Sequence, residues 1–422
     1  MRREHALADW QRASADAELL AAAAACDAGD VAAVTRLRRR WDATVVAVAL
    51  DLVAARRKAR NKFADADRLL CDPQGVEQAT SGGVAAWKAR RFASVVHDLP
   101  QRAAPRQAID LCCGIGGDTK ELARVVPTIG VDCSEVRAWM TAANAACATR
   151  IGEVRDVNVE ESVVHIDPAR RDEAQGRRRH DPDQYEPPLA TCCAIVRAAR
   201  GGAIKLGPGI DPAVLPSETA RPWAIEWISE HGTLVQAVAY TGALVDGSMT
   251  PALAARTATM LPEGLTRAGD VVTVPVAAGG DFGAFLLVPD PALERSGLLG
   301  GLARELGLAE PARGLGILTT DAAPHGHADE GWFTRYEVLA RPRVVEAELR
   351  AAIRACSSGP ARGVRVRTRG KSADADAWTK ALRPEHVEDG ERIGRVGGPE
   401  ELDVFLLRLG STLRAYVTRR SV

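Results

Sequence analysis

An excess of charge of either sign is missing from this 422-residue sequence: Lys and Arg together number 55, and so do Asp and Glu. A chain without net charge carries no global basic field, so any surface for nucleic acid must be local. The composition, 46% hydrophobic and 26% charged, is that of a globular protein rather than a disordered chain. We expect two or three domains at this length, because one core rarely serves so many residues.

Long apolar runs are also missing. No stretch of about 20 apolar residues, the length that spans a bilayer, occurs anywhere. The opening segment, MRREHALADWQRASADAELL, carries charges throughout and contains no apolar signal core. We therefore expect a soluble, cytoplasmic protein with no membrane contact. The sequence indicates no obligate protein partner.

The cysteines are not spaced for metal binding. Nine are present, as two vicinal pairs and five singles, and no CxxC occurs. This spacing argues against a zinc site, so we expect no bound metal. In a reducing compartment disulfides are not expected either, and most of these thiols should be small core side chains. Internal repeats and low-complexity tracts are missing as well.

The first half of the chain divides into two predicted regions. Residues 1–77 are predicted to be a helical module, because strong helix formers dominate them. Over residues 78–241, short apolar runs (AIDLC, TIGVD, VVHID, AIKLG) alternate with helical segments. That alternation predicts parallel strands joined by right-handed crossovers. EWISEHGTLVQAVAY then predicts an antiparallel pair of strands around a His-Gly turn at the sheet edge.

The second half divides at residue 342. Residues 242–341 are richer in glycine and proline, with expected strands at VVTVPV, FLLV and LGILTT and a helix over residues 291–306. Residues 342–422 are predicted to form a helix, the strand VRVRTRG, a second helix, and the strands LDVFLL and LRAYV.

A glycine-rich turn lies in AIDLCCGIGGDTKELA, residues 108–123. Glycines let a backbone approach a ligand closely, and the helix that follows adds unpaired N–H groups. Dinucleotides and S-adenosylmethionine (SAM) are both bound by such turns. The dinucleotide fingerprint requires three glycines; Gly114 and Gly116 fit the first two positions, but Thr119 occupies the third.

Three acidic residues end the predicted strands. Asp110 precedes the turn, where its carboxylate can organise the loop and face the ammonium of an amino-acid ligand. Asp132 ends TIGVD and can accept both ribose hydroxyls of either cofactor class. The third is Asp167, which follows the strand VVHI and begins Asp-Pro-Ala-Arg-Arg. Together they favour SAM over a dinucleotide.

These motifs resemble those of class I SAM-dependent methyltransferases, whose first motif is roughly D/E-x-x-x-G-x-G and whose fourth is often D/N-P-P-Y/R. GIGGDTKELA, with the preceding QATSGGVAAWKARRF, is most similar to the trimethylguanosine synthase branch. The resemblance implies an α/β fold with a doubly wound, Rossmann-like sheet, and SAM as the cofactor. It implies cofactor contacts at the methionine end for Asp110, Gly114, Gly116 and Gly117, at the ribose for Asp132, and at the adenine amino group for Asp156.

A second resemblance concerns the C-terminal part. GVRVRTRGKSADADAWTKALRP is similar to the THUMP-like domain appended to a bacterial methyltransferase family. That family also carries DPARR and a small ferredoxin-like insert, which LVPDPALERSGLLGGLARELGL matches. The resemblances cover most of residues 78–422. They imply C-terminal α+β domains, ferredoxin-like within residues 242–341 and THUMP-like over residues 342–422.

The DPARR motif is the predicted catalytic centre, with Asp167, Pro168 and Arg170 as its residues. Methyl transfer is an in-line displacement, so the protein mainly positions the nucleophile and takes or masks its proton. Ala169 and Arg170 replace the second proline and the aromatic of amino-methylating enzymes, which argues against DNA-type amino methylation. Arg170 can stack on a base or pair with a phosphate, as the Asp-Pro-Pro-Arg of RNA methyltransferases suggests. We therefore expect an RNA substrate.

Other residues near this motif are interpreted as follows. Lys205 ends a strand before Gly-Pro-Gly and could contact substrate or a carboxylate, and His165 alternates with apolar residues, which predicts a packed histidine. The polar segment after the motif either is a solvated loop or binds RNA phosphates, with these candidates for contact: Arg171, Arg177, Arg178 and Arg179.

A covalent mechanism is not expected. Methylation of C5 in a pyrimidine needs a cysteine nucleophile, and AIKLGPGID has none at the required place. Cys192 and Cys193 share helical spacing with Leu189 and Val196, which predicts a buried helix face. We expect methylation at nitrogen or oxygen. Two alternatives stay open: an NAD(P)-dependent oxidoreductase, and an RNA-binding protein on a catalytically inactive methyltransferase core.

Overall fold

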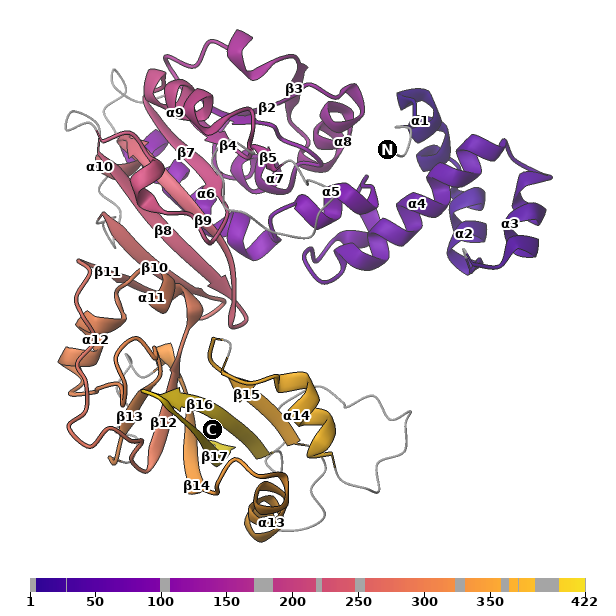
Figure 1. Cartoon of the computed structure of the whole chain (residues 1–422). Helices are drawn as coiled ribbons and strands as arrows, with labels where there is room; N and C mark the ends of the chain where they lie inside the picture. Colours follow the sequence, from indigo (N-terminus) through magenta and orange to yellow (C-terminus); the bar gives the residue numbers. More distant parts are fainter. Residues whose placement is uncertain are drawn as a thin grey trace. The chain divides into compact units, whose positions relative to one another are not determined.

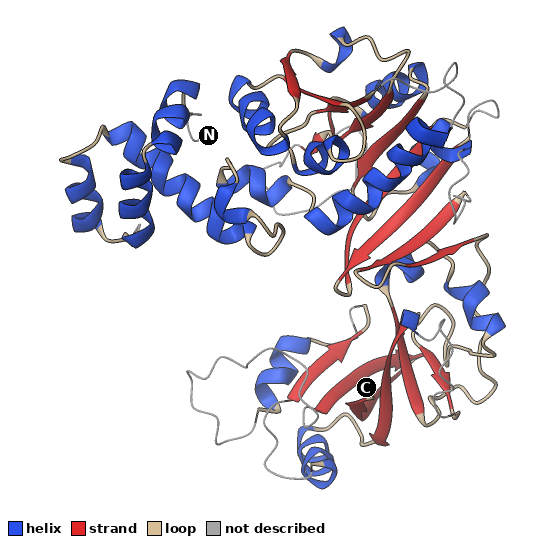
Figure 2. Ribbon diagram, turned by 180° about the vertical axis from the view of Figure 1, so that it is seen from behind, coloured by secondary structure: helices blue, strands red, loops and turns tan. Residues whose placement is uncertain are grey.

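The computed structural model describes residues 5–27, 29–98, 107–170, 185–217, 222–246, 255–322, 331–357, 364–370, 372–383 and 402–421. The chain forms two compact units, the first made of Met1–Glu230 and Val235–Ala255 and the second of His231–Leu234 and Arg256–Val422. Figure 1 gives the labels of the helices and strands, and Figure 2 separates them by type.

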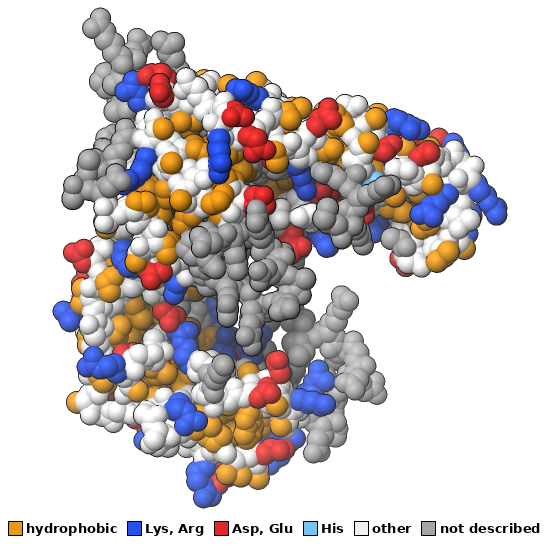
Figure 3. All heavy atoms as spheres, turned by 45° about the horizontal axis from the view of Figure 1, so that its top comes forward, with side chains coloured by type: hydrophobic (Ala, Val, Ile, Leu, Met, Phe, Trp, Pro, Cys, Tyr) orange, Lys and Arg blue, Asp and Glu red, His pale blue; other side chains and the backbone are white. Residues whose placement is uncertain are grey.

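The N-terminal segment is helical, as predicted. It contains α1 (Leu7–Ala15), α2 (Ala17–Ala25), α3 (Val31–Arg38) and α4 (Ala43–Ala59), followed by the 3-10 turn η1 (Ala66–Arg68). Asp16, Asp30 and Asp42 begin α2, α3 and α4 by accepting hydrogen bonds from the first free backbone N–H groups. Lys and Arg side chains are interspersed with Asp and Glu over these helices (Figure 3). The Arg40–Glu18 and Arg60–Asp67 ion pairs belong to this mixed surface.

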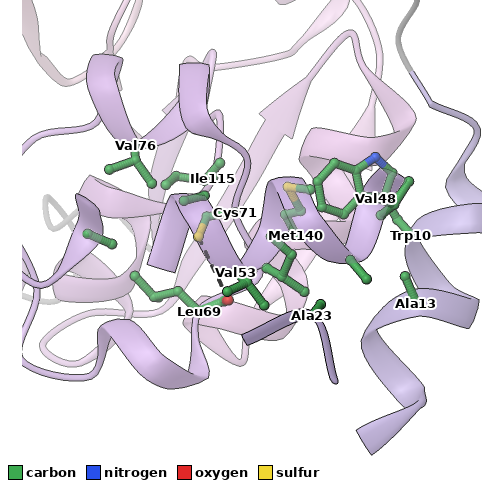
Figure 4. Packing of buried hydrophobic residues seen from close by; sticks show 14 of the residues in the cluster. Trp10, Ala13, Ala23, Val48, Val53, Leu69, Cys71, Val76, Ile115 and Met140 are labelled. Atoms are coloured by element: carbon green, nitrogen blue, oxygen red, sulfur yellow. Dashed lines mark hydrogen bonds between the residues drawn. The ribbon is translucent and has the colours of Figure 1, made fainter. Parts of the chain in front are cut away.

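The helical module shares a hydrophobic core with the glycine turn and with helix α8. Its central helix α4 contacts α1, α2, α3 and α5. The same buried cluster includes Trp10 of α1, Ile115 of the glycine turn and Met140 of α8 (Figure 4). In addition, Asn144 donates hydrogen bonds to the carbonyl oxygens of Leu70 and Ile115, both at 2.8 Å. The module is therefore attached directly to the glycine turn.

The remainder of the first unit alternates strands and helices. In chain order it contains α5 (Pro73–Gln78), α6 (Gly82–Asp98), β1 (Ala108–Leu111), α7 (Gly117–Ala123), β2 (Thr128–Asp132), α8 (Glu135–Ala145), β3 (Ala148–Ile151), η2 (Val154–Asp156), β4 (Val163–Ile166), β5 (Ala169–Arg170), β6 (Tyr185–Glu186), α9 (Leu189–Ala198), β7 (Gly201–Leu206), η4 (Pro212–Val214), β8 (Trp223–Glu230), β9 (Thr233–Gly242) and α10 (Ala243–Asp246). The strands AIDL, TIGVD, VVHI and GGAIKL confirm the predicted ones.

The sheet of this unit has the strand order β8-β9-β7-β4-β1-β2-β3. Pairs β1–β2, β2–β3, β1–β4 and β4–β7 are parallel, whereas β9 runs antiparallel to β7. The predicted His231-Gly232 turn joins β8 to β9, and both residues have the positive φ of a tight hairpin turn, 51° and 72°. A dinucleotide-binding sheet has the order 3-2-1-4-5-6. Here β7 takes the place of the fifth strand and β8 that of the sixth, and the antiparallel β9 lies between them.

The direction of the chain reverses at β1. From β1 it moves to β2 and β3, and later strands lie on the other side, beginning with β4. Right-handed crossovers therefore put α7 and α8 on one face of the sheet and α9 on the other. The long helix α6 runs across the sheet and contacts α7 (Figure 2). At such a reversal a crevice opens beyond the carboxyl ends of the strands, here those of β1 and β4.

The second unit is a mixture of strands and helices. It contains β10 (Arg256–Leu261), β11 (Leu265–Ala268), β12 (Phe285–Pro289), α11 (Pro291–Arg295), α12 (Leu299–Glu305), β13 (Leu318–Thr320), β14 (Phe333–Ala340), α13 (Glu346–Cys356), β15 (Val364–Thr368), α14 (Ala375–Ala381), β16 (Leu402–Leu409) and β17 (Thr412–Arg420). Six of these strands form a sheet in the order β13-β12-β14-β17-β16-β15. Strands from both sides of residue 342 thus share one sheet, and the four-region division of the chain stays a prediction.

Two local predictions in this unit are wrong. VVTVPV, residues 271–276, is not a strand; Val276 makes an isolated bridge to Glu310. Pro275 has no N–H to donate to a ladder, Val271 is 59% exposed, and within the described residues the segment makes no longer ladder than this bridge. The helix expected over residues 291–306 is two helices, because Gly297 adopts a left-handed conformation with φ of 81° between them. The predicted C-terminal helices and strands are confirmed.

Candidate active site

The glycine turn has three residues with positive φ: Cys112 at 59°, Gly114 at 58° and Gly116 at 84°. A Cβ placed on Gly114 would meet no atom of the described residues within 4 Å. A Cβ on Gly116 would lie 3.2 Å from Cα of Thr141, and one on Gly117 would lie 3.1 Å from the carbonyl oxygen of Thr80. Among the described residues Gly114 therefore borders open space, whereas Gly116 and Gly117 lie close to the protein's own backbone.

Asp132 holds the turn from the end of β2. Its Oδ2 accepts a hydrogen bond from the backbone N–H of Gly114, and its Oδ1 accepts one from Ser134, both at 2.9 Å. Burial raises the pKa of this carboxyl, which is 9% exposed. The predicted ribose acid and the first glycine of the motif are thus directly bonded. Asp156, the predicted adenine contact, is exposed in η2 after β3, the strand that pairs with β2.

Asp110 is buried and engaged inside the protein. Its Oδ2 accepts from the hydroxyl of Thr119 at 2.5 Å, and its Oδ1 lies 2.7 Å from Nδ1 of His165. With 1% exposure, the carboxylate ties β1 to β4 and to α7. These contacts support the loop-organising role of Asp110, while its contact with an ammonium stays a prediction. His165 is buried as expected, and the sequence did not indicate its hydrogen bond.

The network continues to α6 through Lys88, which is 2% exposed. The Lys88 ammonium lies 3.1 Å from Nε2 of His165 and 2.6 Å from Oδ1 of Asp118. An ammonium only donates, so Nε2 accepts, and the ring proton is assigned to Nδ1, which donates to Asp110. Oδ2 of Asp118 accepts from the hydroxyl of Thr80 at 2.7 Å. A buried network of ionisable groups therefore links β1 and α7, which flank the glycine turn, to β4 and α6.

This network makes the stability of the protein pH-dependent. Burial alone would raise the pKa of Asp118, but the positive charges of Lys88 and Lys205 outweigh burial and hold it well below the ordinary value of 3.8. A carboxyl whose pKa is lowered in the folded state contributes stability that is complete above the unfolded-state pKa. This stability is lost as the pH falls from the unfolded-state pKa to the folded-state pKa. We expect the unfolding free energy from urea titrations to fall as the pH drops below 3.8, with a smaller slope in Asp118→Asn. Equal slopes in the two proteins would contradict this account.

Asp167 and Lys205 form an ion pair at the carboxyl ends of β4 and β7. The Lys205 ammonium lies 2.7 Å from Oδ2 of Asp167 and also donates to the carbonyl oxygen of Gln78 at 3.1 Å. Their side chains are 27% and 13% exposed, so the pair is partly open to solvent. The predicted catalytic acid and one predicted substrate-binding residue are therefore brought together.

The rest of the motif leads into a short ribbon. Pro168 is followed by β5, which pairs antiparallel with β6 and sets the backbone of Arg170 opposite Tyr185. The Tyr185 hydroxyl accepts the N–H of Gly207, a contact of 2.9 Å that the sequence did not indicate. The side chain of Arg170 is outside the described part of the structure, and so are four predicted substrate contacts: Arg171, Arg177, Arg178 and Arg179.

Cys112 is a site residue that sequence reasoning missed. It lies between β1 and the glycines, is half-buried, and has the left-handed backbone that few residues other than glycine adopt. Burial raises the pKa of its thiol, and the negative charges of Asp132 and Asp167 raise it further. The negative charges of both acids therefore raise the pKa of the same thiol. The turn, the β2 acid and the β4 acid converge at one edge of the sheet.

Comparison with known proteins identifies the fold. No family model matches the chain, and no curated protein matches it. A solved structure that is similar over nearly the whole chain is a Porphyromonas gingivalis W83 protein provisionally named a methyltransferase. It shares 13% identity, covers 96% of this chain and 98% of its own, and has a TM-score of 0.63. The chain has a methyltransferase fold. The predicted Rossmann-like sheet, preceded by helices and followed by an α+β part, is confirmed.

Two further similar structures cover less of the chain. Magnesium protoporphyrin IX methyltransferase from Synechocystis PCC 6803, solved with bound SAM, has 14% identity, covers 38% of this chain and 79% of its own, and has a TM-score of 0.27. A Pyrococcus horikoshii protein provisionally named an RNA methyltransferase has 16% identity, covers 38% and 84%, and has a TM-score of 0.25. The trimethylguanosine synthase and THUMP-like resemblances stay predictions. None of the helices that the structure describes combines the length and apolarity needed to cross a bilayer.

Proposed function

We propose that the protein is a SAM-dependent methyltransferase that modifies a nitrogen or oxygen atom of an RNA without a covalent intermediate. One observation carries the proposal. β1 lies between β2 and β4, so the open turn at Gly114 is flanked by Asp132 on one side and by the Asp167–Lys205 pair on the other. A ligand lying along this edge would meet a ribose acceptor, a bare backbone and a catalytic carboxylate in that order.

The residues present fit SAM. No atom of the described residues lies within 4 Å of the place that a Cβ on Gly114 would occupy, which suits close approach of a ligand to the backbone. Asp132 retains lone pairs for ribose hydroxyls after accepting two N–H groups. When bound, SAM would supply a methyl group on a positively charged sulfur. We assign Gly114, Gly116, Gly117, Asp110, Asp132 and Asp156 to its site, as the resemblance implies.

The chemistry left to the protein is positioning and proton transfer. Lys205 engages Oδ2 of Asp167. Oδ1 is the oxygen that we assign to the N–H or O–H of the acceptor, which it would orient and relieve of its proton. Arg170 would hold the substrate by stacking or by pairing with a phosphate. RNA is favoured by this arginine, by the basic segment that follows it, and by the THUMP-like resemblance of residues 342–422.

A nicotinamide-dependent oxidoreductase fits less well. The third glycine of the dinucleotide fingerprint allows close packing of helix and strand. Its place is taken by Thr119, which is fully buried and bonded to Asp110. RNA binding without catalysis would not require Asp132 and Asp167 to lie at the same edge of the sheet. Calorimetric titration with SAM and with NADH tests the cofactor. Incubation with tritiated SAM and total cellular RNA or protein tests turnover and identifies the acceptor class.

Asp132→Ala should weaken SAM binding by about 1–3 kcal/mol, the usual cost of leaving hydrogen-bonding groups unpaired. The change removes the acceptor of the ribose hydroxyls and also frees the N–H of Gly114. Calorimetry measures the affinity, and thermal unfolding checks that the protein is folded. An unchanged affinity would remove Asp132 from the cofactor site.

The double variant Cys192→Ala/Cys193→Ala should retain methyl transfer. Both thiols are buried on α9, and burial raises the pKa of Cys192 to about 12 and that of Cys193 to about 11, so neither is a ready nucleophile. Turnover with tritiated SAM measures the activity. Loss of turnover at an unchanged melting temperature would overturn the non-covalent mechanism, and so would a trapped adduct with a 5-fluoropyrimidine RNA.

A further inference from the structure

The short link from the last residue of α5 to the first of α6, residues 78–82, touches both halves of the proposed site. A Cβ on Gly117 of the glycine turn would lie 3.1 Å from the carbonyl oxygen of Thr80 and 3.4 Å from Cβ of Ala79. At its beginning, the carbonyl oxygen of Gln78 accepts the hydrogen bond from Lys205, the partner of Asp167. A shift of this segment would therefore affect both the glycine turn and the Asp167–Lys205 ion pair.

Lys62, at the end of the helical module, holds this segment on both sides of Gln78. Its ammonium donates to the carbonyl oxygens of Val76 and Glu77, both at 2.8 Å, and to that of Ala79 at 2.9 Å. Three ammonium protons thus meet three carbonyl oxygens. The carbonyl oxygen of Lys62 also accepts the N–H of Gly82 at 2.9 Å. One residue of the module fixes the chain that carries the Gln78 oxygen.

This arrangement has an electrostatic cost. Burial lowers the pKa of Lys62, and the positive charge of Lys205 lowers it further, whereas Glu77, Glu230 and Asp167 act in the opposite direction. Two partly buried ammonium groups are therefore held on one stretch of backbone. The oxygens of Val76 and Glu77 belong to the last turn of α5, and that of Ala79 belongs to its cap residue, so the lysine also caps this helix.

We infer that Lys62 is a positioning residue for methyl transfer: through the carbonyl oxygens around Gln78 it fixes Lys205, and through Lys205 it fixes the carboxylate of Asp167. The inference rests on the proposed function for its kinetic consequence, because a carboxylate displaced from the acceptor costs rate. The structural linkage itself can be tested without any substrate. A residue from the N-terminal helices thereby completes the catalytic edge of the sheet.

The linkage is tested by acetylation of Lys205 with acetic anhydride, followed by mass spectrometry and normalised to the exposed Lys58. In Lys62→Met, release of the segment should make Lys205 react about five times faster or more, since reactivity follows local opening. Loss of a neighbouring positive charge would slow the reaction, so acceleration reports release. Lys62→Arg and Arg60→Met, which breaks an exposed ion pair on the same helix end, should match the wild type. Equal Lys205 reactivity in Lys62→Met and wild type would overturn the inference.

The kinetic role is tested by a double-mutant cycle with tritiated SAM and total cellular RNA. Lys62→Met should lower kcat about tenfold, Lys62→Arg should restore it, and Lys62→Met in a Lys205→Met background should change kcat by no more than about twofold, because both act through one ion pair. A purely structural cap would instead lower the melting temperature and give additive losses, which would overturn the inference. A wild-type protein that does not bind SAM would contradict the proposed function, and the acetylation result would still decide the linkage.

Discussion

Replacement of Asp167 by asparagine should lower kcat for methyl transfer about 100-fold or more, with the affinity for SAM unchanged. Asparagine keeps the size of the side chain and can still accept a hydrogen bond from Lys205, but it cannot take a proton from the acceptor. The loss should appear in kcat because the contact with the departing proton strengthens only in the transition state. Calorimetry for SAM and initial rates with tritiated SAM measure the two quantities.

The control for this prediction is Arg170→Ala. If Arg170 binds the substrate equally in the ground and transition states, its loss should raise KM for RNA and leave kcat nearly unchanged. Substrate affinity should fall with added salt, less steeply in the Arg170 variant if the partner is a phosphate. Wild-type turnover in Asp167→Asn would remove the DPARR motif from the active site. Parallel losses of stability and activity in both variants would mean that the two residues only close a turn.

Where burial decided the structure, the sequence predicted it well. The strands of the first unit are runs of apolar residues because both faces of a parallel sheet are covered, and β1 and β4 are buried along their whole length. Such runs, separated by helical segments, specify the order of the elements. The hairpin of β8 and β9 was equally predictable, since His231-Gly232 occupies the two positive-φ positions that a tight turn requires.

Where a strand depends on its neighbours, the sequence was a poor guide. β14 (Phe333–Ala340) was missed because only Tyr336 among its residues is buried, so the alternation that marks a strand is weak. VVTVPV has high strand propensity, but in the described part of the chain it forms only the single bridge from Val276 to Glu310. Strand propensity reports how well side chains fit a pleated, half-buried surface, and that surface is supplied by other parts of the chain.

The candidate site shows the same division. The placement of Gly114, Asp132 and Asp167 at one edge of the sheet was predictable, because they lie at the ends of apolar strands and parallel strands bring their carboxyl ends together. The hydrogen bonds of the residues that support the site were not predictable, because the partners come from distant segments. Lys88 is 77 residues from His165, and Gln78 is 127 residues from Lys205. One signal for Lys88 was present. It interrupts the apolar face of α6 at the spacing that links Val84 to Phe92, which marks a lysine pointing inward.

The glycine turn allows a sharper test than the strands do, because its glycines differ in what surrounds them. Gly116→Val, the obvious probe, would press on the backbone of Thr141 as well as on a ligand. Its loss of SAM binding would therefore mix steric exclusion with damage to the fold. Gly114 avoids this problem, since an added Cβ there meets nothing within 4 Å in the part of the chain that the structure describes.

Gly114→Asn should reduce SAM affinity by more than about 100-fold, or about 2.7 kcal/mol, by filling the space that the ligand requires next to the backbone. Asparagine is chosen because it tolerates the left-handed conformation that φ of 58° demands. Gly232→Asn is the matched control: this glycine has φ of 72° and lies in the turn between β8 and β9, and an added Cβ there would also meet none of the described residues within 4 Å. Both variants should lose similar, small amounts of stability in thermal unfolding, and calorimetry should show that only Gly114→Asn loses SAM. Equal SAM affinity in the two variants would place the cofactor elsewhere.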